Sequence, residues 1–248
     1  MLFELINGID PLHVRLYQFL IFLCAIIISL TIHELCHGLS AYKLGDTTAK
    51  SMGRLSLNPL KHIHPVGMLM LVVAGFGWAK PVMVDPRYFR DPKRDMAITA
   101  LAGPASNFVL AFIMVIFLKL MQIAGLTEFD IAGWDTAGNT YYSIGGSNLV
   151  SGFFSSLFVY TAMISTGLAF FNLIPIPPLD GSKVLASFLP ERLYWRYMQL
   201  ERYGMMILIA IILLGGSVFS VIGDLRNSLL NLMVSLLRLP FQVPYFVT

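Results

Sequence analysis

Apolar positions dominate this 248-residue chain in long runs that short polar segments separate. An α-helix needs about 20 consecutive apolar residues to cross the hydrocarbon core of a bilayer. Four runs reach that length and are predicted to be membrane-spanning helices: residues 16–44, 96–123, 153–176 and 203–222. The pattern therefore predicts an all-α polytopic membrane protein, built as a single domain over residues 1–248.

Three other segments depart from this pattern. Residues 66–79, "VGMLMLVVAGFGWA", are apolar but short and rich in glycine, which indicates a re-entrant or interfacial loop. Residues 225–248 mix apolar positions with arginine, asparagine and proline, so we interpret them as an interfacial tail, with a fifth span as the alternative. Residues 47–58, "TTAKSMGRLSLN", alternate loosely, which predicts a small β-strand element at the cytoplasmic membrane edge.

Composition and charge support this class of protein and orient it. Only 12% of the residues are charged, against about a quarter in soluble domains, and the mean hydropathy is +0.73. Residues 43–96 hold nine lysines and arginines and residues 180–203 hold four, whereas residues 119–152 hold one. Because basic loops stay in the cytoplasm, residues 43–96 and 180–203 should face inward and the N-terminus outward. A solvated cytoplasmic face explains the basic residues, so no nucleic-acid partner is expected.

The end of the first predicted span contains "HELCH", residues 33–37. On a helix, His33 and His37 project from the same face and can grip one divalent metal ion, while Glu34 lies about 100° round, placed to act on a water as a general base. With five histidines and five glutamates, chance would give this pattern roughly 0.002 times. The alternative is a pair of histidines hydrogen-bonded inside a bundle, but ionisable residues in a membrane are costly and are usually functional.

A catalytic zinc takes three protein ligands, so a third ligand should come from elsewhere in the chain. Asp180 follows the third predicted span in "FFNLIPIPPLDGSKVL", where three prolines break the helix. A broken helix at membrane depth is tolerated where it lines a cavity. Asp180 is therefore the best candidate for the third ligand, and the alternative is an aspartate that caps a helix beginning near Ser182.

Three motifs, in this order, carry a family resemblance: "HELCH", "AGPASN" at residues 102–107 and "NLIPIPPLDG" at residues 172–181. With them, the chain resembles the site-2 protease family of intramembrane zinc metalloproteases, and in particular its small bacterial subgroup without PDZ or CBS domains. Two further stretches are similar to this subgroup, "NPLKHIHPVG" at residues 58–67 and "FGWAKPV" at residues 76–82.

The resemblance implies a metal site and a reaction. It implies one Zn²⁺ per chain, held by His33, His37 and Asp180, with Glu34 as the general base of peptide hydrolysis. It also implies that Asn172 lies near the scissile carbonyl, where its amide would donate to the developing oxyanion; helix packing is the alternative role.

The same resemblance implies the surroundings of the site. Asn107 is expected to line the core or to bond the motif-bearing helices, and Gly103 and Pro104 to allow close helix approach and a kink. The expected substrates are transmembrane segments of single-pass proteins in a prokaryotic cytoplasmic membrane, cut near its cytoplasmic face, and self-association is left open. Because a helical peptide bond must unwind before cleavage, the strand at Gly53, Arg54 and Leu55 is predicted to pair with the substrate, and loop 66–79 to gate its entry.

Several positions depart from the family pattern. Cys36 stands where the family often has a small residue such as alanine, and we interpret it as a buried small residue rather than as a ligand. His64 stands where an aspartate is expected, and the spacing of His62 and His64 is only a weak signal for a second metal site.

Two other classes of protein are alternatives to a protease. A metal-ion transporter also places histidine and aspartate within the membrane, and a catalytically inactive scaffold would bind membrane helices without cutting them. Glu34 between the two histidines favours hydrolysis.

Overall fold

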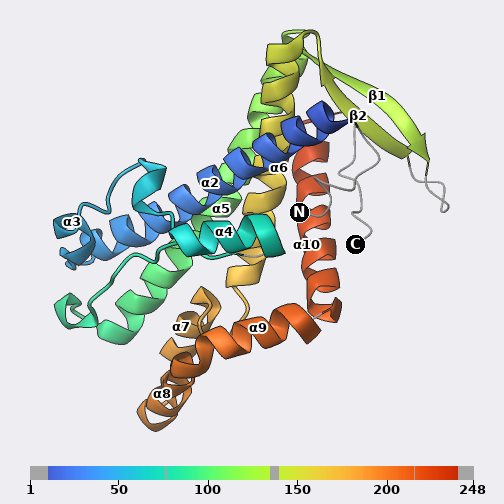
Figure 1. Cartoon of the computed structure of the whole chain (residues 1–248). Coiled ribbons are helices and arrows are strands. Elements are labelled where there is room, and N and C mark those ends of the chain that lie inside the picture. The colour runs from blue at the N-terminus through green and yellow to red at the C-terminus, as the bar shows by residue number, and fades with distance from the viewer. Residues whose placement is uncertain (1–10, 76, 135–139, 215, 240–248) are drawn as a thin grey trace.

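The structure, a computed structural model, describes residues 11–75, 77–134, 140–214 and 216–239, and helices dominate them. The all-α polytopic prediction is confirmed (Figure 1). The helices are α2 (Leu12–Lys43), α3 (Thr48–Ser51), α4 (Pro65–Ala74), α5 (Pro92–Ile123), α6 (Leu149–Asn172), α7 (Asp180–Ser187), α8 (Glu191–Met198), α9 (Gly204–Leu214) and α10 (Gly216–Leu236). The strands are β1 (Thr127–Trp134) and β2 (Thr140–Gly146).

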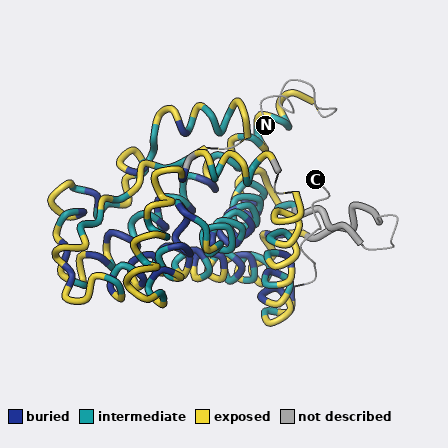
Figure 2. Tube along the Cα trace, turned by 90° about the horizontal axis from the view of Figure 1, so that it is seen from below, coloured by how far each residue is buried: buried dark blue, intermediate teal, exposed yellow. Residues whose placement is uncertain are grey.

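Three of the described helices, α2, α5 and α6, are long and apolar enough to cross a membrane. They cover most of the first three predicted spans and pack against one another as a bundle. Local sequence signals fix where two of them begin. Asp91 caps α5 by accepting a hydrogen bond from the backbone N–H of Arg94, and Asn148 and Ser151 form a reciprocal capping box at the start of α6. Figure 2 shows the buried residues along the inner faces of the helices.

The fourth predicted span, residues 203–222, is not one helix. It is divided between α9 and α10, whose axes differ by 80°. The pair counts as a fourth crossing only if the bent pair is taken as one span. The sequence "LLGGS" at the junction explains the break, because adjacent glycines weaken a helix. In Figure 1, α10 stands alongside α6 and α9 lies across its foot.

The interfacial-tail interpretation differs from the structure over residues 225–236, which form the second half of α10. Leu230, Met233 and Val234 are buried, and they join a core cluster with side chains of α5 and α6. These positions recur at helical spacing, so they form one apolar face that the polar residues between them obscure in the linear sequence. Residues 240–248 of the predicted tail lie outside the described residues.

The predicted strand at residues 47–58 is also wrong. This segment forms helix α3 and a turn in which Gly53 adopts a positive φ of 64°. Among the described residues, the sheet is instead an antiparallel hairpin of β1 and β2 that connects α5 to α6, with Thr127 opposite Gly146 and a register shift between Ile131 and Gly133. The pairing of Gly53, Arg54 and Leu55 with a substrate therefore loses its structural basis.

The segment predicted as a re-entrant loop folds back on itself. After helix α4 the chain returns, and an antiparallel bridge joins Ile63 to Ala79. The return is tight, because a Cβ placed on Gly67 would lie 2.1 Å from the carbonyl oxygen of Trp78. We refer to this fold-back as the α4 hairpin.

Candidate metal centre

Two imidazoles from α2 form the first half of the site. His33 and His37 lie one turn apart on the same helix face, and both are buried. Their Nε2 atoms are 3.0 Å apart. The spacing in the sequence therefore produces two converging nitrogens inside the bundle.

Asp180 comes from a different part of the chain. Helix α6 ends at Asn172, the proline-rich segment turns, and α7 begins at Asp180 itself. Its Oδ2 atom is 3.1 Å from the Nε2 atoms of both histidines. The capping alternative is wrong, because the N-cap of α7 is Leu179 and no side chain makes a capping hydrogen bond there.

The three side chains fit one metal ion. Their ligand atoms all lie within 4.8 Å of one another, and this is the only such group of His, Cys, Asp and Glu among the described residues. Zinc bonds of about 2.0–2.1 Å at tetrahedral angles would separate neighbouring ligand atoms by about 3.3 Å. The observed separations of 3.0–3.1 Å are close to that value. Two imidazoles and one carboxylate also match the donor set of catalytic zinc sites, which keep a fourth position open.

Helix α5 shapes the site from the opposite side. The Nδ1 atom of His37 is 2.7 Å from the carbonyl oxygen of Thr99, so Nδ1–H donates there and Nε2 is left for a metal. A Cβ on Gly103 would lie 2.4 Å from Nε2 of His37 and 2.7 Å from Cε1 of His33. Only glycine leaves room for both rings at this position. Pro104 is buried beside it.

Glu34 is not part of the group formed by His33, His37 and Asp180. It is half-buried, and its Oε2 accepts a hydrogen bond of 2.9 Å from the backbone N–H of Val82. This bond holds Oε2 in place, and Oε1 takes no part in it. Because Val82 acts through its backbone, no side-chain pattern pointed to this contact.

The chain that approaches Glu34 is held in place by Arg54. The guanidinium donates to the carbonyl oxygens of Lys80, at 2.5 Å, and Pro81, at 2.9 Å. Arg54 is buried, with 5% of its surface exposed. It therefore faces inward and holds backbone, which differs from the strand role predicted for it.

The Lys80–Val82 segment is anchored on both sides. The N–H of Lys80 donates to the carbonyl of His62, and the N–H of Asp85 donates to the buried carboxylate of Asp46. Hydrogen bonds from Arg87 lower the pKa of Asp85 below its ordinary value, so its carboxylate stays charged.

The remaining candidates have other surroundings. The amide of Asn172 donates to the carbonyl of Leu168, one turn back in α6. Asn107 is fully buried, and neither of its amide atoms has a hydrogen-bond partner among the described residues. Cys36 is half-buried and does not join the ligand group. His62 is bonded to the carbonyl of Ser56 and His64 caps α4, so neither joins a metal-ligand group among the described residues.

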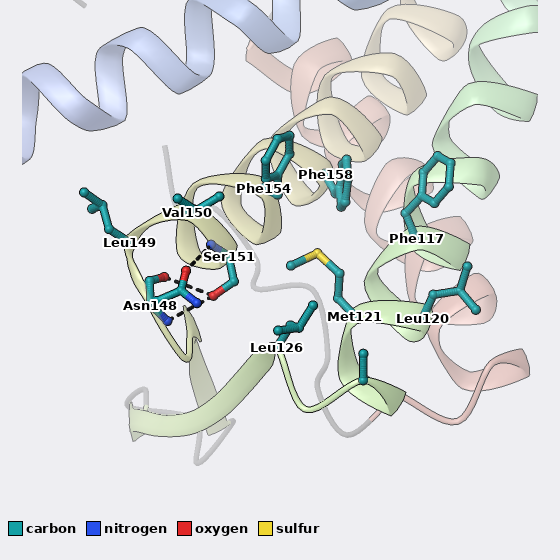
Figure 3. A pocket seen from close by; sticks show the side chains of 11 residues that line it. Phe117, Leu120, Met121, Leu126, Asn148, Leu149, Val150, Ser151, Phe154 and Phe158 are labelled. Atoms are coloured by element: carbon teal, nitrogen blue, oxygen red, sulfur yellow. Dashed lines mark hydrogen bonds between the residues drawn. The ribbon is translucent and has the colours of Figure 1, made fainter.

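Two cavities differ in their relation to the site. An apolar cavity of about 860 Å³ lies between the end of α5 and the start of α6 (Figure 3), lined by residues such as Phe117 and Phe158. Phe117 is 14 residues beyond Gly103, or about 21 Å along the helix. A smaller cavity of about 180 Å³ lies between α2, α4 and α6, and Thr31 and Leu168 are among its lining residues. The smaller cavity borders the part of α2 that carries the ligands.

The fold and site define a class: a polytopic membrane protein with a buried His–His–Asp group that can hold a metal ion and a glutamate beside it. The profile of peptidase family M50 matches residues 21–215. The chain is 37% identical over 186 residues to YwhC of Bacillus subtilis, covering 75% of this chain and 77% of that protein. The chain therefore belongs to peptidase family M50, the site-2 protease family.

Other relatives agree with this family. Rip2 of Mycolicibacterium smegmatis is 28% identical over 200 residues, covering 79% of this chain and 67% of Rip2. MJ0611 of Methanocaldococcus jannaschii is 32% identical over 169 residues, covering 67% of this chain and 70% of that protein. All three relatives are provisionally named zinc metalloproteases. No solved structure matches the chain.

Proposed function

We propose that this protein is a zinc-dependent intramembrane endopeptidase that hydrolyses peptide bonds in transmembrane segments of single-pass substrates. The observation that carries the proposal is the meeting of His33, His37 and Asp180 from two segments nearly 150 residues apart. Family membership supports zinc as the metal and peptide hydrolysis as the reaction.

The reaction assigns separate roles to the metal and to the side chains. Zinc, when bound by the three ligands, supplies Lewis acidity that acidifies water and polarises the peptide carbonyl. Glu34 takes the proton of the attacking water and returns it to the leaving nitrogen. The hydrogen bond from Val82 keeps the carboxylate turned for this transfer.

Asn172 is proposed to donate to the carbonyl oxygen as negative charge develops on it. Its amide now donates to Leu168, so it has to turn away from α6 when the substrate carbonyl arrives. Asn172 is the last residue of α6, and a helix end allows such a turn more readily than a helix interior does.

The site is proposed to lie near the cytoplasmic face of a prokaryotic membrane. Six residues separate His37 from Lys43, the last residue of α2, which is about 9 Å along the helix. The basic segments that follow α2 and precede α5 favour a cytoplasmic location for this end of the bundle and an outward N-terminus. Relatives in bacteria and an archaeon support the prokaryotic setting.

The substrate is proposed to enter beside α4. The cavity of about 180 Å³ between α2, α4 and α6 has the size for one apolar side chain, and Leu30, Thr31 and Leu168 line it. Movement of the α4 hairpin would open the cavity to a helix in the bilayer, which unwinds before it is cut.

Metal analysis together with a cleavage assay tests the proposal. Wild-type protein should hold about one zinc per chain and cut a transmembrane substrate. Glu34→Gln should keep zinc and lose cleavage, because it removes the base and no ligand. Asp180→Ala should lose zinc affinity. Transport of zinc into liposomes by a wild type that never cuts a substrate would contradict the assignment.

A further inference from the structure

His33 has a donor that the metal centre leaves without an acceptor. When a metal occupies Nε2 of a neutral imidazole, the proton resides on Nδ1. Metal-ligating histidines nearly always donate this N–H to an acceptor, which fixes the ring. His37 has such an acceptor in the carbonyl of Thr99. Within the part of the chain that the structure describes, the buried Nδ1 atom of His33 has no hydrogen-bond partner.

Asn107 has an amide group that can supply an acceptor. It is 0% exposed, and both its amide oxygen and its amide nitrogen are buried without a partner. An unpaired amide in a helical core destabilises the fold, so such a group usually has a role. Nothing in the hydrolytic mechanism uses it.

The packing of α2 on α5 places His33 and Asn107 on neighbouring turns. His37 bonds Thr99, and both histidine rings lie against Gly103. The two helices are therefore antiparallel here. Moving along α5 from Thr99 to Asn107 corresponds to moving along α2 from His37 toward its N-terminus. Asn107 is one turn beyond Gly103 on the same face of α5. Side chains lean toward the N-terminus of their helix, which inclines His33 toward the turn that carries Asn107.

Buried positions repeat every fourth residue along this contact on both helices. On α2 they are Ala25, Ser29, His33 and His37; on α5 they are Ala111, Asn107, Gly103 and Thr99. The two series run in opposite directions, so Asn107 lies level with the turn between Ser29 and His33.

Other buried hydroxyls without a partner are less well placed. Thr99 lies on the side of Gly103 that His37 already occupies. Thr161 is one turn before Ser165 on α6, and the hydroxyl of Ser165 meets Ser29 at 2.8 Å. Thr161 is therefore about two turns from His33 and serves as a matched control.

We propose that Asn107 is a positioning residue of the metal centre: its Oδ1 accepts the Nδ1–H of His33 when Nε2 is committed to the metal. Without metal, Nε2 of His33 faces Oδ2 of Asp180 at 3.1 Å and can carry the proton itself. With Nε2 committed to a metal, the proton of the neutral ring would reside on Nδ1, where Asn107 would hold the ring and fix its tautomer. The inference rests on the metal site of the proposed function and not on proteolysis.

Zinc affinity, measured by competition with a chelator on the purified full chain, tests this role. Asn107→Leu keeps the side-chain shape and removes the acceptor, so it should weaken zinc binding 10- to 100-fold. Asn107→Asp keeps an acceptor and should stay within about threefold of wild type. Thr161→Val removes another unpaired buried group and should leave affinity unchanged. The visible absorption bands of Co²⁺ bound in place of zinc should shift in Asn107→Leu and not in Thr161→Val.

The outcomes separate this inference from the proposed function. A wild type that binds no zinc would overturn the proposed function itself. A wild type that binds zinc, with Asn107→Leu binding it equally well, would overturn only the role of Asn107. If Asn107 were simply an unpaired core amide, the leucine variant would also melt higher than wild type without metal. Should Asn107→Leu not fold, Asn107→Ala carries the same expectation for zinc.

Discussion

The candidate metal centre depends on the missing side chain of Gly103 as well as on the three candidate ligands. Gly103 has no side chain, and both imidazoles occupy the space where a Cβ would stand. Spacing and helix breakers in the sequence mark the three candidate ligands, which the structure brings together. The family resemblance assigned Gly103 to close helix packing, but it could not show that the close neighbours are the ligands themselves.

Gly103→Ala should therefore disable the metal site while the bundle stays folded. The new methyl group would lie 2.4 Å from Nε2 of His37, so the ring must move out of its ligand position. We expect zinc affinity to fall at least tenfold and cleavage to be lost, which metal analysis and a substrate assay would measure. Gly167→Ala on α6 is the control, because its Cβ would meet only Arg226 at an ordinary 3.7 Å. Full zinc content in Gly103→Ala would show that the rings lie elsewhere.

Arg54 is connected to Glu34 through backbone groups. It holds the carbonyls of Lys80 and Pro81, and the next N–H, of Val82, bonds Glu34. Backbone groups carry no side-chain signature, so a sequence pattern could name Arg54 but not its partner. The strand prediction failed there because the inward side chain binds loop carbonyls and not a sheet edge.

Arg54→Met should lower the turnover number about tenfold or more while zinc content stays at the wild-type level, because Glu34 loses its fixed orientation and the ligands do not. Arg54→Lys should recover part of the activity through one of the two carbonyls. Arg87→Met is the control, since Arg87 is exposed and pairs only with Asp85. Loss of zinc together with activity in Arg54→Met would point to a role in folding instead.

At the scale of elements, the sequence located the apolar segments better than it described how they end. The first three spans were predicted because 20 or more apolar residues have few other uses. The β1–β2 hairpin depends on contacts with other elements, which the local pattern does not carry, whereas the glycine pair that separates α9 from α10 was present in the sequence but was interpreted as part of one span. The apolar face of α10 became visible only when α5 and α6 lay beside it.

The α4 hairpin has a strict steric requirement at Gly67. Gly67 lies against the backbone of Trp78, so a side chain at position 67 would force the returning segment away. Gly67→Ala should destabilise the protein by about 1–3 kcal/mol and reduce cleavage, with zinc retained because the ligands lie on α2 and α7. Thermal unfolding and metal analysis measure the two effects. Gly152→Ala, with an ordinary contact of 3.6 Å, should change neither. Normal cleavage in a destabilised Gly67→Ala would exclude the hairpin from substrate entry.

At the scale of the whole molecule, the ligand set connects the first long helix to a segment that follows the third. His33 and Asp180 are 147 positions apart, and α7 also packs against α5. A bound metal therefore joins elements that the bundle core alone holds less directly. Only the chemistry of the ligands predicted this long-range contact, because hydrophobic patterning is silent about which helices meet.

Removing the metal should accordingly lower the thermal stability of the whole chain. A ligand that binds only the folded state adds about 2.7 kcal/mol when its concentration is 100 times its dissociation constant. For a chain of this size that is about 5–11 °C in the midpoint of thermal unfolding. We expect a chelator to lower the midpoint of wild type and of Glu34→Gln by this amount, because both keep the three ligands, and to leave Asp180→Ala unchanged. The comparison must be made in one detergent, since detergent alters membrane protein stability on its own. An equal chelator effect on Asp180→Ala would mean that the stabilising metal is bound elsewhere, and the His–His–Asp group would then lose its claim to be the zinc site.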